Sequence, residues 1–217
     1  MKKFFAFALA ALLAVPAWGA SFKRINPQKF LDLCETGPAE QIASAIEAGV
    51  DANVRDGQGE TALMKAAKRN GIDAMRVLIA ADANINARDS DGDTALMFAA
   101  GKNTVEVVNA LIAAGADVNA RNGNGESALM KAAAGNTPAV IDALIEAGAG
   151  DDADENGQTS LMKAAAGNTP EALDALLEAG AYVRARDKDG RRAIDYARRN
   201  KKLKDTGALA RLEFESR

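Results

Sequence analysis

The strongest constraint on the fold is a nine-residue segment that returns along the chain every 32 or 33 residues. Its first copy, residues 59–67, reads Gly-Glu-Thr-Ala-Leu-Met-Lys-Ala-Ala. The central leucine recurs at positions 63, 96, 129 and 161, and Ile194 takes this place in a fifth copy. Units of this length cannot bury their apolar face alone, so they must stack on one another into one elongated array.

Each unit is predicted to hold two short helices. The Thr or Ser before Ala-Leu-Met is a natural N-cap for the first helix. The second helix is clearest over 105–114, where apolar residues recur at helical spacing. Pro138 and Pro170 open second helices at a position that costs no hydrogen bond, and a glycine such as Gly115 is expected to end them. Asp82 takes the glycine position in one repeat, where we expect a small local penalty.

Between helix pairs lies an extended segment rich in turn residues. It is complete over 115–121 as Gly-Ala-Asp-Val-Asn-Ala-Arg and continues into Asn-Gly-Asn-Gly. Such a segment predicts a β-turn or hairpin-like loop that projects from the helices.

These features resemble the ankyrin-repeat family. The family pattern Gly-x-Thr-Pro-Leu-His-x-Ala-Ala is matched from Gly59 to Ala67, with Ala62 and Met64 in place of Pro and His. The resemblance implies an all-α solenoid of stacked helix-turn-helix units, in which the methionine column fills the core instead of forming hydrogen bonds. We divide it into six repeats: 22–55, 56–88, 89–121, 122–153, 154–186 and 187–217, the first and last being caps.

The N-terminus has the order of a secretory signal peptide. Two lysines precede an apolar run over 4–15, which is too short to span a bilayer, and small residues follow. We predict cleavage after Gly19, with Ala17 and Ala20 as alternatives. The prediction is a signal peptide over 1–19 and an exported single solenoid over 20–217, periplasmic or secreted, monomeric and without stable membrane insertion.

The composition argues against catalysis. The chain has no histidine, which removes the commonest general base and metal ligand, and a single cysteine, Cys34. Cys34 shares the register of Ala67, which favours a buried thiol. Residues 152–157 match only the opening of an EF-hand loop, because Lys163 stands where the last ligand, a glutamate, belongs. We predict no enzyme, no cofactor and no metal site.

Charge is distributed unevenly along the chain. From Arg184 onward there are twelve Lys and Arg against six Asp and Glu, although the whole chain is acidic. This basic end is either a solvated cap or a surface that attracts an acidic partner or anionic lipid. A nucleic-acid partner is not expected in an exported protein without interleaved aromatic residues.

The resemblance implies that a partner protein binds the concave face, formed by loop tips and first helices. Phe98 stands out because it is the aromatic residue in a column otherwise made mostly of lysine. The candidate binding residues are Glu60, Lys65, Lys68, Arg69, Asp91, Asp93, Phe98, Lys102, Glu126, Lys131, Gln158, Lys163, Arg191 and Tyr196.

The predicted function is therefore protein binding, with inhibition or protection of a periplasmic enzyme as the specific role suggested by the resemblance in an exported setting. A secreted effector that acts on a host protein is the alternative, followed by a metal-binding protein.

Overall fold

The computed structural model describes residues 26–69, 71–102 and 104–216. The predicted signal peptide therefore lies outside the described residues. Twelve α-helices follow one another in the described part, where the only bridge of β type is an isolated pairing of Arg55 with Thr61. The all-α prediction is confirmed, and the projecting loops close by turns instead of β-ladders.

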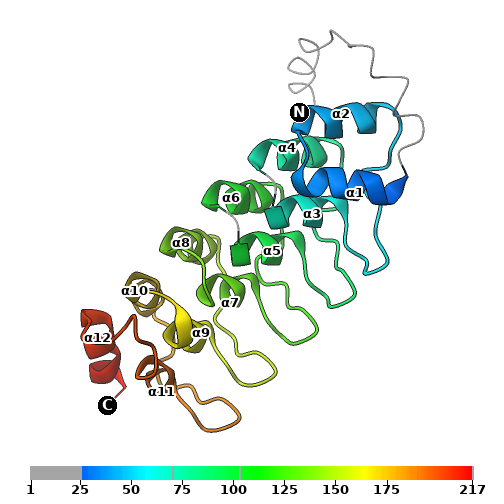
Figure 1. Cartoon of the computed structure of the whole chain (residues 1–217). Coiled ribbons are helices and arrows are strands. Elements are labelled where there is room, and N and C mark those ends of the chain that lie inside the picture. The colour runs from blue at the N-terminus through cyan, green and yellow to red at the C-terminus, as the bar shows by residue number, and fades with distance from the viewer. Residues whose placement is uncertain (1–25, 70, 103, 217) are drawn as a thin grey trace, which may run out of the picture.

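The helices form two parallel rows (Figure 1). The inner row holds the first helix of each pair: α1 Pro27–Thr36, α3 Ala62–Arg69, α5 Ala95–Lys102, α7 Ala128–Ala133, α9 Ser160–Gly167 and α11 Ala193–Ala197. The outer row holds the second: α2 Ala39–Glu47, α4 Ile72–Ala80, α6 Val105–Ala113, α8 Pro138–Glu146, α10 Pro170–Glu178 and α12 Gly207–Glu215. The long loops project beside the inner row.

The helix ends follow the sequence signals. Ser127 and Thr159 accept hydrogen bonds from the amides three residues on, at 3.3 and 3.4 Å, as N-caps do. Pro138 and Pro170 are the first residues of α8 and α10. Asp82 has φ 57° where the other repeats have a left-handed glycine, as its position in the register predicts.

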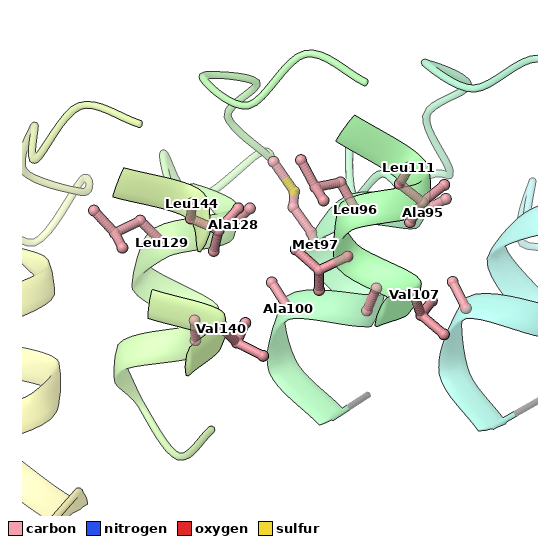
Figure 2. Close-up of a cluster of buried hydrophobic side chains, with 14 of the residues drawn as sticks. Ala95, Leu96, Met97, Ala100, Val107, Leu111, Ala128, Leu129, Val140 and Leu144 are labelled. Atoms are coloured by element: carbon pink, nitrogen blue, oxygen red, sulfur yellow. The ribbon is translucent and has the colours of Figure 1, made fainter. Parts of the chain in front are cut away.

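The core is continuous through the stack and consists largely of alanine, leucine and methionine. Met64, Met97, Met130 and Met162 are all buried, as expected for core residues. Figure 2 shows two adjacent repeats of this core, in which Leu96 and Met97 of one repeat lie on the side that faces Ala128 and Leu129 of the next. Because alanine takes little room, α5 and α7 approach closely and the inner row becomes a nearly continuous surface.

The C-terminal helix α12 covers the end of the core with one face only. Its Leu212 is fully buried. Phe214 is instead 75% exposed, because it is two residues from Leu212 and a helical step of that size turns to another face. No helix in the described ranges is long and apolar enough to span a bilayer.

Candidate protein-binding surface

Five loop tips line one side of the inner row, and we call them the fingers: residues 56–60, 89–93, 122–126, 154–158 and 187–191. In every finger an Asx side chain at the first position accepts two hydrogen bonds from backbone amides of the same finger. Asp89, for example, accepts from Asp91 and Asp93 at 3.0 and 2.9 Å, and Asn122 from Asn124 and Glu126 at 3.0 and 2.9 Å. The same pattern holds for Asp56, Asp154 and Asp187. Each finger tip is therefore closed by its own side chain.

Neighbouring fingers are also joined to one another. The amide of Gly123 donates to the carbonyl of Asp91 in the preceding finger at 2.7 Å. An equivalent backbone hydrogen bond joins each of the other pairs of neighbouring fingers. Gly92 permits this spacing, since it has φ 81° and an added Cβ would lie 3.0 Å from the Gly123 nitrogen. The fingers therefore form a connected, preorganised edge.

Two side-chain ladders reinforce the edge below the tips. Arg55 donates to the carbonyl of Arg88 at 2.8 Å, Arg88 donates to Arg121, and Arg121 donates to Ala153. Asn86 connects consecutive repeats in the same way, since it donates to Gly115 and accepts from the Asp117 amide. These bonds tie the loops together in a chain that lacks the family histidine.

A third ladder lies at the turns between the paired helices. Asn168 is 3% exposed and donates to the carbonyls of Ala133 and Asn136 at 3.0 and 3.1 Å. Asn200 in turn donates to the Asn168 carbonyl at 2.9 Å. The sequence interpretation missed these asparagines, although the Gly-Asn-Thr segment that recurs at Asn136 and Asn168 was a signal that could have identified two of them.

Lysines of the inner row bind carboxylates of the fingers. Lys65 contacts Asp56 at 2.8 Å and also binds Glu60, which in addition binds Lys68. Desolvation opposes ionisation of Glu60, but the hydrogen bonds and charges of the two lysines lower its carboxyl pKa. Three of the predicted binding residues therefore pair with one another.

A second ion-pair centre forms between repeats. Glu126 lies 2.7 Å from Lys131 and 3.0 Å from Lys163, which also contacts Asp154 at 2.9 Å. Partial burial opposes ionisation of Glu126, but the two lysines lower its pKa to about 2. Both oxygens of the Asp154 carboxylate have partners. One oxygen contacts Lys163, and the other accepts hydrogen bonds from the backbone amides that close the finger.

Phe98 occupies the lysine position of α5 and is half-buried. The ammonium of Lys68 lies 4.3 Å from the centroid of its ring, in cation–π geometry. Asp93 accepts a 2.8 Å hydrogen bond from Asn122 and lies 3.8 Å from the Lys131 ammonium. Phe98 thus interrupts the chain of lysines without making a polar contact of its own.

The last finger uses an arginine and a tyrosine in place of the lysine. Arg191 pairs with Asp187 at 3.1 Å and lies over the Tyr196 ring, whose hydroxyl donates to Asp187. Gln158 donates to the same hydroxyl at 2.8 Å. These three predicted residues are brought together.

The remaining predicted residues lie apart from these centres. Arg69 is exposed and pairs with Glu35 of the preceding repeat at 3.4 Å. Asp91 and Lys102 are exposed, at a finger tip and near the end of α5. The structure therefore places the candidate residues along one face but leaves few of their charges unpaired.

The ionisable side chains of this surface are engaged mainly in salt bridges. Within the described ranges no three His, Cys, Asp or Glu side chains come close enough to hold a metal ion. Burial raises the pKa of the Cys34 thiol to about 12, far from the value of a nucleophile at neutral pH. The fingers and the inner helices thus form a polar surface, closed by hydrogen bonds, that includes the half-buried Phe98 side chain.

The geometry agrees with comparisons to known proteins. No curated protein matches the chain. Among solved structures it resembles the ankyrin-type immunity protein in the complex titled Bd0816 predatory endopeptidase from Bdellovibrio bacteriovorus with immunity protein Bd3460. The identity is 26%, the TM-score is 0.73, and the match covers 86% of this chain and 97% of that one. The model described as ankyrin repeats (3 copies) matches residues 32–122, 114–187 and 129–205, so the chain belongs to the ankyrin-repeat family.

Proposed function

We propose that this protein is an exported binding module that holds a partner protein on its concave face and inhibits, or protects its own cell from, a periplasmic enzyme. The observation that carries the proposal is the similarity to an immunity protein over nearly the whole length of that chain. The closest chemical analogy for the partner is the endopeptidase named in that complex.

The surface suits binding better than chemistry. Its fingers are closed by their own side chains and joined by backbone hydrogen bonds, so little conformational entropy is lost when a partner docks. Its acids and lysines are largely neutralised within the molecule, which leaves no proton donor and acceptor poised over a substrate.

The test is capture followed by inhibition. The mature chain, immobilised by its C-terminus, is exposed to periplasmic extract, and the purified captured enzyme is then titrated with the free protein. The concave variant is Asp91→Arg with Lys102→Glu, which changes two exposed charges and spares the salt bridges. The matched control is Glu106→Arg with Asp142→Lys, two exposed positions on the outer helices.

We expect the mature chain and the control to capture one hydrolase and to abolish its activity at a one-to-one ratio, while the concave variant captures less. A captured enzyme that stays fully active at saturation contradicts the inhibitory role. Equal capture by both variants contradicts the concave interface.

Export is part of the proposal and is tested separately. Mass spectrometry of the protein purified from the periplasmic fraction should find a new N-terminus after residue 17, 19 or 20. An intact N-terminus on protein recovered only from the cytoplasm contradicts export.

A further inference from the structure

Most fingers share one contact that is missing from the second finger, residues 89–93, which belongs to the third repeat. In three repeats the inner-helix side chain donates to the first residue of its own finger: Lys65 to Asp56, Lys163 to Asp154 and Tyr196 to Asp187. The equivalent pair in the third repeat is Phe98 with Asp89. Phenylalanine has no donor, so this carboxylate lacks the partner that the repeat geometry otherwise supplies.

The fourth repeat also lacks this contact, but it leaves no carboxylate without a donor. There the finger begins with Asn122, so Lys131 has no carboxylate to neutralise at that position and pairs instead with Glu126. In the second, fifth and sixth repeats a lysine or tyrosine of the inner helix thus pairs with an aspartate at the start of the finger. In the fourth repeat the finger starts with a neutral asparagine instead. The third alone combines an acid with a side chain that cannot pair with it.

The electrostatics of the two kinds of finger differ accordingly. Partial burial raises the pKa of Asp89, helped by the charges of Asp91 and Asp93, and no cation lies within salt-bridge distance of it in the part of the chain that is described. At Asp56 burial acts in the same direction, but Lys65 outweighs it and the pKa is lowered. Asp89 carries an uncompensated charge that a cation from outside would stabilise.

The neighbouring cations do not fill this place. Lys68, stacked on the Phe98 ring, is bound to Glu60, and Lys131 is bound to Glu126. Lys102 lies one helical turn beyond Phe98 and is exposed. Asp89 itself is half-buried, and its finger neighbours Ser90 and Asp91 are exposed.

We propose that the second finger, residues 89–93, and Phe98 form the point at which the partner protein is recognised, by receiving an arginine side chain of the partner between the aromatic ring and the Asp89 carboxylate. A guanidinium is the chemistry that fits, because it stacks on an aromatic face and donates to a carboxylate at the same time. The charge is complementary, since residues 89–93 hold three aspartates and no base. This inference rests on the proposed function only in taking the partner to be a protein.

The test uses a minimal probe instead of the partner. Acetyl-Gly-Arg-Gly-amide and its citrulline counterpart, which is nearly isosteric and uncharged, are titrated into the mature chain carrying labelled phenylalanine. Binding is read from the NMR shift of the Phe98 ring. We expect weak, saturable binding of the arginine peptide and a response at least fivefold weaker with citrulline.

Three variants separate recognition from folding. Asp89→Asn keeps the finger closed, since Asn122 makes the same two amide bonds, but removes the charge. Phe98→Lys supplies the missing intramolecular cation, so it should raise the unfolding midpoint. In Phe98→Lys, binding is read from the backbone amide of residue 98. Both should weaken arginine binding at least fivefold. Asp154→Asn, the matched change at a finger carboxylate that is already paired with Lys163, should leave it unchanged.

Equal responses to arginine and citrulline, or unchanged binding in Asp89→Asn, would overturn the inference. Because the peptide assay needs no partner, it can fail while an enzyme is captured and inhibited. It can also succeed while no enzyme is captured, so failure of this inference and failure of the proposed function are distinguishable.

Discussion

Glu126 connects two repeats through charge, and its removal has a stability effect that can be estimated. Glu126→Gln keeps the backbone amide bond to Asn122 and nearly the same volume, but it loses the charge shared by Lys131 and Lys163. A carboxyl pKa lowered from 4.5 to about 2 corresponds to about 3 kcal/mol if it is expressed in full. The side chain is 20% exposed and the lysines are similarly exposed, so solvent screening should reduce the loss to about 1–2 kcal/mol.

The pH dependence identifies the cause. The folded pKa lies below the unfolded value, so the stabilisation is fully present above about pH 4.5 and is lost as the pH falls toward 2. We expect urea unfolding, followed by circular dichroism, to show wild type more stable than Glu126→Gln at pH 7. The difference should shrink at pH 3.5 and nearly vanish at pH 2.

The matched control is Glu146→Gln, an exposed glutamate on α8 for which the free energy of unfolding should not change by more than about 0.5 kcal/mol. High salt should also reduce the effect at Glu126. The reasoning is refuted if the difference between wild type and Glu126→Gln is the same at pH 7 and pH 2. In that case packing, and not charge, would account for it.

Three further changes test other parts of the structure. Asn168→Ala should cost about 2–3 kcal/mol, because it leaves two buried carbonyls without their donor, and urea unfolding measures it. Ser160→Ala should destabilise the fold by about 1 kcal/mol, because the buried Ser160 hydroxyl and amide both lower the pKa of the Asp151 carboxyl against the effect of its burial; an unchanged or higher thermal midpoint would contradict this. Cys34 should not react with a thiol reagent at pH 8 until the chain unfolds, and rapid labelling of the native protein would argue against its burial.

The architecture could be predicted because it depends on local signals repeated several times. The Thr or Ser caps, the prolines that open α8 and α10, and the methionine column each follow from one residue type in one helical position. Repetition turns each weak signal into a strong one, since an error in one unit would break the register of all the others. The exposure of Phe214 does not follow from the repeats in this way, because α12 belongs to the C-terminal cap, whose sequence no other repeat copies.

The use of the surface could be predicted only in part. The sequence placed acids in the loop tips and lysines on the first helices as candidate binding residues, but it did not show that Lys163 reaches across to Glu126 of the preceding repeat. That contact joins residues 37 positions apart and depends on the stacking distance and on rotamers. The Asx residues that open the fingers were passed over as loop residues, although they fix the tips.

The charged side chains that recur in the repeats are paired with one another in intramolecular salt bridges. A partner could therefore bind them only by breaking these salt bridges. Lys65, Lys131 and Lys163 would have to exchange an existing carboxylate for a new one, which gains little. Specificity must then come from positions that depart from the repeat. Phe98 opposite Asp89 is such a departure, since it leaves the Asp89 carboxylate without a donor from the inner helix and places an aromatic ring, stacked with Lys68, where other repeats have a lysine. The residues that stabilise the array are thus those that repeat, and those that select a partner are those that do not.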